Sequence, residues 1–288
     1  MARIADLLHA GPTLSFEFFP PKTDEMERQL DKTLAELALL SPSFVSVTYG
    51  ALGSTRDRTR DVVLRINREQ AFPCMAHLTC VGHTRDDIAR LLDEYAVAGV
   101  ENILALGGDP PADGSDPGGD YAYACELVET VRAHPAGFCI GVAAHPELHP
   151  RSPDRRSDRQ RLAEKLHVAD FGVTQFFFDA DDYFRMMDEL DSLGCSKPVV
   201  PGIMPILTIP GVKRMAAMNG TVIPAAVLDR LEVAEDDDDA IVDIGVEVAT
   251  ALCAEMIEAN APGLHLYALN RPTSVRRIYD KLGLSRSN

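Results

Sequence analysis

The chain has 288 residues, of which 46% are hydrophobic, and a formal net charge of -16 at pH 7. Nucleic acids and anionic membranes bind proteins through basic patches, so this charge argues against both as partners. The sequence contains no apolar run of membrane-spanning length, and its N-terminus lacks the apolar stretch and cleavage site of a signal peptide.

Eight short apolar runs recur along the chain and predict strands, with helix-length amphipathic segments between them. In chain order the runs are LSFEFFP (14–20), FVSVTYG (44–50), CMAHLTC (74–80), NILALGG (102–108), FCIGVAAH (138–145), FGVTQFFF (171–178), VVPGIMP (199–205) and LHLYALN (264–270). Strands that alternate with helices of this length are typical of parallel strands with crossover connections.

Eight such units predict an α/β protein, a single (β/α)8 TIM barrel. We expect residues 1–288 to form one catalytic domain, with no C-terminal regulatory domain. An open doubly wound sheet is the alternative, but the chain lacks the Gly-rich fingerprints of that fold.

Three segments between the strands have distinct expected structures. Thr84 is the expected N-cap of a helix over TRDDIARLLDEYAVAG (84–99), with Asp87 three residues on. The segment GGDPPADGSDPGGD (107–120) predicts a loop above the carboxyl ends of the strands. The acidic run EDDDDA (235–240) predicts a solvated helix start rather than a metal site.

The six cysteines are scattered and form no CxxC pair. They are typical of reduced thiols in a cytoplasmic protein, rather than of a disulfide framework or a zinc site. The segment HPELH (145–149) places two histidines around a glutamate, but Pro146 prevents the helix on which zinc proteases hold such a pair. We therefore predict no metal site.

The first strand holds a carboxylate, Glu17, in an otherwise aromatic and apolar run. A buried carboxylate without a partner costs several kcal/mol or takes up a proton. Strand alternation places Ser15 on the inward face with Glu17, and Phe16 and Phe18 toward the helices. Glu17 therefore either interacts with a partner group or is protonated and serves as a proton donor.

Other strands also carry polar residues near their carboxyl ends, where a purely structural barrel would prefer Val, Ile and Leu. These residues are Ser46, Thr48, His77, Thr79, Asp109, Gln175, Tyr267 and Arg271. Each alone has an ordinary structural explanation, such as a capped backbone group or a turn. Together they line one end of one barrel and predict a functional site there.

The segments SFEFFPPKT (15–23), FVSVTYGA (44–51), HLTC (77–80), GDPP (108–111), TQFFFD (174–179), PGIMP (201–205) and LYALNR (266–271) together resemble the methylenetetrahydrofolate reductase family. The resemblance implies an enzyme, a (β/α)8 barrel that reduces 5,10-methylenetetrahydrofolate to 5-methyltetrahydrofolate with NADH or NADPH. It places the chain in the one-carbon metabolism that supplies methionine synthesis, with a folate as its small-molecule partner.

The resemblance assigns the catalytic roles to Glu17 and Asp109. Glu17 matches the general acid that protonates N10, so that the folate ring opens to an N5 iminium cation, which accepts the hydride. We expect a raised pKa for this acid among its aromatic neighbours. Asp109 matches an aspartate near the flavin and the folate, and its charge would stabilise the iminium cation.

The resemblance also implies binding residues. Gln175 matches the glutamine that hydrogen-bonds the pterin, Arg271 an arginine that contacts substrate, and Tyr267 lies beside them as a further substrate-binding candidate, as Asp109 does. The positions expected to bind the cofactor are Thr48, Tyr49, His77, Gly108, His145, Asp158, Arg161 and Lys165.

Three positions depart from the flavin-contact pattern of the family, which normally carries FAD. Gly107 stands where an arginine is usual, His145 where a tyrosine is usual, and Arg161 where an asparagine is usual. The acidic residues of the folate chemistry, Glu17 and Asp109, are both present.

Three hypotheses follow from this pattern. In the first, the enzyme binds FAD weakly or not at all, and the nicotinamide transfers hydride directly to the iminium. The second is an ordinary FAD-dependent reductase in which substitutions compensate. The third, a folate-binding protein without catalysis, gives no reason to bury Glu17. The sequence leaves open whether NADH or NADPH is preferred and whether the chain forms a homo-oligomer.

Overall fold

The computed structural model describes residues 2–49, 56–109, 115–116 and 118–284. The strands are β1 (Thr13–Phe18), β2 (Phe44–Val47), β3 (Cys74–Thr79), β4 (Asn102–Leu106), β5 (Cys139–Ala144), β6 (Phe171–Thr174), β7 (Val199–Val200), β8 (Gly202–Ile203) and β9 (Gly263–Tyr267). The helices are α1 (Ile4–Ala10), α2 (Asp24–Ala38), α3 (Arg56–Glu69), α4 (Arg85–Val97), α5 (Ala124–Ala133), α6 (Arg155–Val168), α7 (Ala180–Ser192), α8 (Ile209–Asn219), α9 (Ala225–Val233), α10 (Asp238–Glu258) and α11 (Pro272–Lys281).

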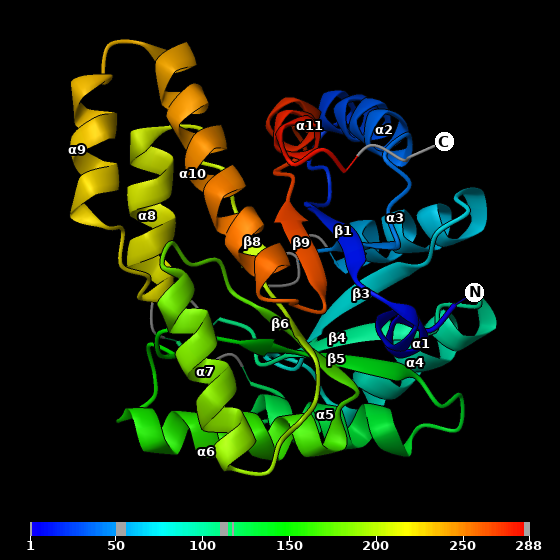
Figure 1. Cartoon of the computed structure of the whole chain (residues 1–288). Coiled ribbons are helices and arrows are strands. Elements are labelled where there is room, and N and C mark those ends of the chain that lie inside the picture. The colour runs from blue at the N-terminus through cyan, green and yellow to red at the C-terminus, as the bar shows by residue number, and fades with distance from the viewer. Residues whose placement is uncertain (1, 50–55, 110–114, 117, 285–288) are drawn as a thin grey trace.

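The strands form one parallel sheet in the order β7-β6-β5-β4-β3-β2-β1-β9-β8. β7 and β8 are the two halves of the predicted seventh strand, separated at Pro201, which has no N–H to donate to the ladder. β7 pairs with β6 and β8 pairs with β9, so this broken strand closes the sheet. The predicted (β/α)8 barrel is confirmed, with helices around the outside of the strands (Figure 1).

Local sequence signals set most of the helix starts. Thr84 and Asp87 form the expected capping box at the start of α4. The acidic run 235–240 begins α10, where the Asp237 side chain accepts from the N–H of Ala240. Both predictions are confirmed, and both rest on side chains that satisfy the free N–H groups of a first helical turn.

Two predicted segments differ in detail. Gln175 was expected within the sixth strand, but β6 ends one residue earlier, although the Gln175 N–H still donates to the Ala144 carbonyl at 2.7 Å. Residues 107–109 form no helix or strand after β4, as the loop prediction requires. Residues 110–114 and 117 of that loop, and residues 50–55 after the second strand, lie outside the described residues.

The alternation of side chains divides the core into two layers. Phe16 and Phe18 are fully buried between the strands and the outer helices, as predicted. Phe44, Met75 and Phe171 fill the inside of the barrel toward the amino ends of the strands. The barrel is therefore a packed core below the level at which polar residues begin.

Helix α1 closes the amino end of the barrel. Ile4 is fully buried against the interior cluster, and its N–H donates to the Asn102 side chain at 2.8 Å. The Asn102 amide in turn donates to the Ala2 carbonyl at 3.1 Å. The opposite end, where the polar residues gather, is the end that can receive a ligand.

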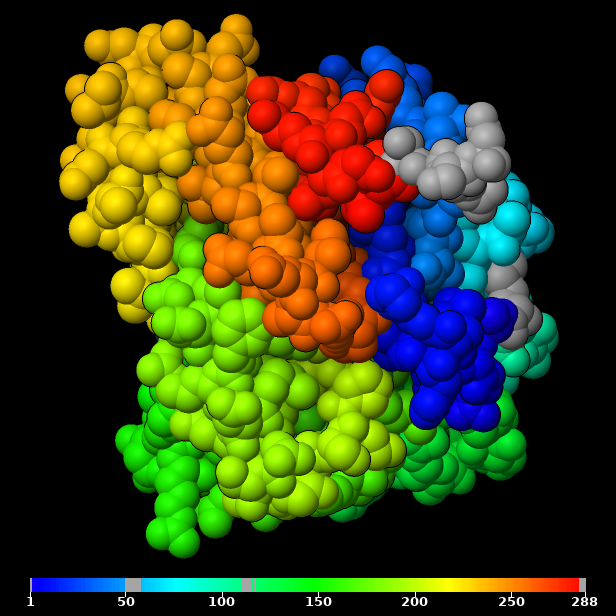
Figure 2. Space-filling model, viewed as in Figure 1, coloured from blue at the N-terminus to red at the C-terminus, as the bar shows by residue number. Residues whose placement is uncertain are grey.

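Helices α8, α9 and α10 extend one side of the barrel, and α8 and α9 form a lobe at one corner of the molecule, drawn in yellow in Figure 2. Val212, Leu231 and Ile241 join the three helices in a separate apolar cluster. Gly245 of α10 packs against the backbone after β8, since a Cβ there would lie 2.1 Å from the Ile206 carbonyl oxygen. This contact fixes the segment that forms one wall of the site.

Candidate active site

Glu17 lies near the carboxyl end of β1 and is 8% exposed. Its Oε2 atom lies 3.2 Å from three groups: the Ser46 hydroxyl, His77 Nε2 and His265 Nε2. The parallel register explains this convergence, because Ser46 pairs directly with Glu17 and His265 pairs with Ser15 one step below. We call Glu17, Ser46, His77 and His265 the acid cluster.

His265 is the member of the acid cluster that the sequence reading missed. It is fully buried, and Nδ1 lies 2.8 Å from the Ser15 hydroxyl, which also donates to the Leu264 carbonyl. Its ring stacks on Phe44 and meets Tyr267 edge to face. The signal was present, since His265 lies two residues before Tyr267 and shares its inward face.

The pKa of Glu17 corrects one prediction. Burial alone would raise it, as expected, but His77 and His265 both face the carboxylate, and their combined effect lowers its pKa to about 2. The expected raised pKa is wrong for this site, because the aromatic run on β1 faces the helices and the inward neighbours are imidazoles. Glu17 is paired, and its carboxyl is ionised at neutral pH.

The ring of Tyr267 meets that of His265 in the acid cluster, whereas Gln175 directly follows β6 at the same end of the barrel. Tyr267 donates its hydroxyl to the Thr174 carbonyl at 2.7 Å, and burial together with the Glu17 charge raises its pKa. The Gln175 side-chain oxygen accepts from the N–H of Phe176 at 3.1 Å, which leaves the donor side of its amide for a ligand. Gln175 therefore fits the predicted contact better than Tyr267, whose phenol braces β6 against β9.

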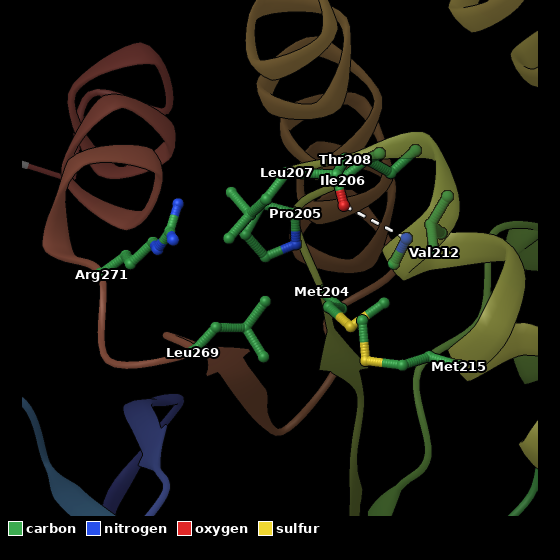
Figure 3. Close-up of a pocket in the computed structure, with 10 residues that line it drawn as sticks. Met204, Pro205, Ile206, Leu207, Thr208, Val212, Met215, Leu269 and Arg271 are labelled. Carbon is green, nitrogen blue, oxygen red and sulfur yellow. Dashed lines mark hydrogen bonds between the residues drawn. The ribbon is translucent and has the colours of Figure 1, made fainter. Parts of the chain in front are cut away.

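Arg271 stands at the edge of an apolar cavity of about 190 Å³ (Figure 3). Met204, Met215 and Leu269 line the cavity with the segment after β8. Among the described residues, no carboxylate lies within ion-pair distance of the Arg271 guanidinium, so its charge is available to an anionic ligand. An apolar wall with one cation at its rim suits an aromatic group that carries a carboxylate.

Asn270 positions this rim and was also missed. Its side chain exchanges two hydrogen bonds of 2.9 Å with the backbone of Phe19, and its carbonyl accepts from Thr33. Leu269 and Asn270 both have positive φ, 51° and 54°. Asn tolerates this left-handed conformation, so the turn carries Leu269 into the cavity and Arg271 to its edge.

The predicted cofactor residues of the second and third strands are also placed. Thr48 follows β2 and contributes backbone contacts, donating from its N–H to Phe18 and accepting from the Thr59 hydroxyl. The Tyr49 hydroxyl lies 2.9 Å from His83 Nε2, a buried residue that the sequence reading did not single out. His77 belongs to the acid cluster, so its imidazole faces Glu17.

Gly108 and Asp109 follow β4 at the same end of the barrel. Gly108 has φ of 83°, and a Cβ there would lie 2.4 Å from Val81 Cγ1, so the position requires glycine. Asp109 is exposed, and its charge acts to raise the pKa of His149. The Val81 and Thr79 side chains fill the space that a Cβ would need, so the backbone of Gly108 packs directly against the end of β3.

His145 and His149 contact each other after β5, with ring centroids 4.6 Å apart. Burial, followed by the charges of His149 and Lys165, lowers the pKa of His145 to about 3, so the ring is neutral at pH 7. Lys165 donates to the Ala143 carbonyl at 3.2 Å, and burial lowers its pKa. We call His145, His149, Arg151 and Lys165 the basic cluster.

Asp158 and Arg161, both on α6, have different surroundings. Asp158 is buried, and its carboxylate accepts from the His149 N–H, the Ser152 hydroxyl and the Arg159 guanidinium. Asp158 therefore holds the turn before α6. Arg161 is exposed on the helix surface.

The described residues contain no group of three or more histidine, cysteine, aspartate or glutamate side chains able to hold a metal ion. Within the same residues, no helix is long and apolar enough to span a membrane. All six cysteines are free thiols, and burial raises the pKa of Cys80 and Cys139 to about 11. The functional groups at this end of the barrel are carboxylates, imidazoles and basic side chains.

Three matches relate the chain to known proteins. The sequence profile of the methylenetetrahydrofolate reductase family matches residues 2–283. A 5,10-methylenetetrahydrofolate reductase of Escherichia coli is 35% identical over 272 residues, which cover 94% of this chain and 90% of that protein. A methylenetetrahydrofolate reductase (NADH) of Arabidopsis thaliana is 36% identical over 298 residues, covering 98% of this chain and 50% of the plant protein.

A solved structure supports the fold. An uncharacterised protein from Clostridium thermocellum, which binds two copies of 5-methyl-5,6,7,8-tetrahydrofolic acid, has a TM-score of 0.66 at 15% identity, covering 98% of this chain and 96% of that chain. At this identity the likeness concerns the barrel alone.

Proposed function

The chain belongs to the methylenetetrahydrofolate reductase family, and we propose that it reduces 5,10-methylenetetrahydrofolate to 5-methyltetrahydrofolate with electrons from NADH or NADPH. The observation that carries the proposal is the acid cluster, a buried carboxylate faced by two imidazoles at the ligand-receiving end of the barrel. The product is a methyl donor, which fits a cytoplasmic role in supplying methyl groups for methionine synthesis.

The chemical task of the protein is to place one proton. When N10 of the folate takes a proton, the bond from N10 to the bridging methylene breaks and leaves an N5 iminium cation. A hydride added to that carbon gives the N5-methyl product, so one proton and one hydride balance the reaction. A dinucleotide, when bound, would supply the hydride, and the residues of the chain supply the proton and the orientation.

We infer that the proton belongs to the acid cluster as a whole. Glu17 is ionised in the free site, so it must receive a proton from a neighbour before it can donate one. His77 and His265 both lie 3.2 Å from Oε2 and can pass it on. A folate ring over Glu17 removes the remaining water, and further burial favours the neutral carboxyl.

Gln175, Asp109 and Arg271 would orient the substrate. Gln175 offers amide donors at the same end of the barrel as the acid, and Asp109 offers a negative charge that stabilises the developing cation. Arg271, at the rim of the apolar cavity, suits the carboxylate of the folate tail, with the tail's aromatic ring against Leu269 and Met215. These contacts bind and hold the substrate but move no proton.

The dinucleotide would lie toward the basic cluster. The Arg151 guanidinium donates to the Gly108 carbonyl there, and Arg151 and Lys165 are basic side chains in a chain of net charge -16. These residues fit the phosphates of either a nicotinamide or a flavin dinucleotide. The direct and the flavin-mediated routes of hydride transfer therefore remain as two forms of the same proposal.

The two routes are separated by measuring NADH and NADPH oxidation by flavin-stripped protein with 5,10-methylenetetrahydrofolate, before and after FAD is added. Turnover without FAD that is unchanged by its addition supports direct transfer. Turnover only with FAD supports the flavin-mediated route. Failure to oxidise either nucleotide under both conditions contradicts the proposed function.

A further inference from the structure

Gly107 is the position at which the chain lacks an expected arginine, and another arginine lies beside it. A Cβ built on Gly107 would lie 3.7 Å from Arg151 Nη2, and the Arg151 guanidinium donates to the Gly108 carbonyl at 3.4 Å. Arg151 comes from the turn between β5 and α6, forty-four positions later in the chain. Because residue 107 has no side chain, there is space beside it, and the guanidinium of Arg151 lies next to that space.

The turn that carries Arg151 is held in place. The Arg151 N–H donates to His149 Nδ1 at 3.1 Å, and the Ser152 N–H donates to the His149 carbonyl at 2.8 Å. Asp158, which is 7% exposed, accepts from the His149 N–H and the Ser152 hydroxyl. The backbone on both sides of Arg151 is thus fixed, while its side chain is exposed to ligand.

The charge on Arg151 is available, unlike that of its neighbours. Arg155 and Arg159 both pair with Glu189 at 2.7 Å. Among the described residues, no carboxylate lies within ion-pair distance of the Arg151 guanidinium, which has only the weak contact with Gly108. A cation that no acid neutralises, over a glycine backbone, is a setting in which a phosphate gains two or more hydrogen bonds.

The surroundings of Arg151 favour an anion. Burial lowers the pKa of His149 and of His145, and the charges of Arg151 and Lys165 act in the same direction. The backbone nitrogen of Ala124, at the start of α5, would lie 3.9 Å from a Cβ on Gly107. The charge of Asp109 acts on the pKa of His149 in the opposite direction.

We propose that Arg151 binds the pyrophosphate of the dinucleotide, with its guanidinium in the space left open by Gly107. The proposal rests on the proposed function for the presence of a dinucleotide, but not for the choice of residue. The pyrophosphate is common to NADH, NADPH and FAD, so the inference concerns whichever of them occupies this end of the barrel.

The test is a set of titrations of the full chain with NADH, NADPH and FAD, each followed by fluorescence. Arg151→Ala is expected to weaken the dinucleotide that binds wild type by about tenfold, as the loss of one charge-assisted contact predicts. Arg156→Ala, which removes an exposed arginine on the same segment, is the matched control and should stay within about twofold of wild type.

A double variant, Gly107→Arg with Arg151→Ala, tests the location of the charge. Gly107 does not have positive φ, and its Cβ would meet only ordinary contacts, so the backbone accepts a side chain. Restored affinity in the double variant supports a phosphate contact in this space. Affinity that stays weak in it, with an unchanged unfolding midpoint, shows that Arg151 acts through Gly108 instead and overturns the proposal.

The inference and the function fail separately. If wild type reduces 5,10-methylenetetrahydrofolate and Arg151→Ala binds its dinucleotide as tightly as wild type, the inference alone is overturned. If Arg151→Ala weakens dinucleotide binding but wild type turns over no folate, the inference stands and the proposed function is overturned. Comparing the NADH, NADPH and FAD titrations identifies which dinucleotide makes the contact.

Discussion

The acid cluster and the basic cluster lie at the same end of one barrel but are built in different ways. Glu17, Ser46, His77 and His265 all project from strands, are nearly or fully buried, and lie at positions fixed by register. In the basic cluster, His149 and Arg151 lie on a turn, Lys165 on a helix, and Arg151 is exposed. The strand register holds the Glu17 carboxylate at hydrogen-bond distance from its partners. In the basic cluster, a turn allows a positive charge to come from a different segment of the chain.

This difference explains how the two regions can depart from a family pattern. A change at Glu17 would leave two imidazoles without their carboxylate, since no second acid is in reach among the described residues. A change at residue 107 leaves an opening that Arg151 can reach. The acid region is therefore the part of the molecule in which single substitutions should have the largest effects.

The sharpest test of that contrast is Glu17→Gln. Glutamine keeps the size and the hydrogen-bonding ability of the side chain but cannot donate an acidic proton, so kcat is expected to fall by about a thousandfold. Folate binding, measured by direct titration, should stay within a few-fold of wild type. The control is Glu147→Gln, a half-buried acid after β5 whose carboxylate accepts from Val222, and its turnover should be unchanged. Turnover that survived Glu17→Gln would remove Glu17 as the acid.

The next effect in size concerns His265. Replacing it by glutamine removes one of the two imidazoles that hold the pKa of Glu17 down, so that pKa is expected to rise and kcat to fall by about ten- to a hundredfold. Carbon-13 NMR of labelled glutamate follows the carboxyl directly. Because His265 is fully buried, Ser15→Ala provides a milder variant that removes only the partner of Nδ1. A Glu17 pKa that moves in neither variant contradicts a shared proton.

Arg271→Ala should have a smaller effect of another kind. Its guanidinium lies at the rim of the cavity and touches no reacting atom, so KM for the folate should rise by about tenfold while kcat changes little. Arg276→Ala, which removes an exposed arginine of α11 that pairs with Glu36 of α2, is the control and should leave both constants unchanged. A fall in kcat at constant KM would mean that Arg271 acts on the transition state.

Most of the fold could be predicted from the sequence because the spacing of apolar residues and the residues that begin or end a helix or strand are local signals. All eight runs became strands, and the acidic start of α10 and the Thr84 cap follow from side chains that satisfy a helix end. The split of the seventh strand at Pro201 was not predicted, although proline gave the signal. The sixth predicted run extends to residue 178, whereas β6 ends at Thr174, although the Gln175 N–H still bonds to the neighbouring strand.

The site was only half predictable, for a physical reason. Strand alternation placed Glu17, Ser46 and His77 on one face, but the pKa of Glu17 depends on His265, whose proximity is set by a strand 248 residues away. Arg151 had no sequence signal at all, because its position depends on a turn that Asp158 holds from the next helix. Contacts between residues far apart in the sequence can be predicted only once the arrangement of the closed barrel is known.

The smallest expected effect compares two glutamates whose pKa values move in opposite directions. The pKa of Glu17 is lowered from 4.5 to about 2, so its ionised form stabilises the fold above about pH 4.5, by at most about 3 kcal/mol, and this is lost as the pH falls toward 2. Burial raises the pKa of Glu147, so its charge opposes folding at neutral pH and the cost disappears as the pH falls through that pKa.

Urea unfolding of wild type, Glu17→Gln and Glu147→Gln between pH 7 and pH 3 measures both. Glu17→Gln should be less stable than wild type at pH 7, with the gap closing below about pH 4.5. Glu147→Gln should be as stable as wild type or more so at pH 7, and should lose any advantage on acidification. If the Glu17 gap instead widened on acidification, the carboxyl would have the raised pKa that its aromatic strand first suggested, and the two imidazoles would not hold that pKa down.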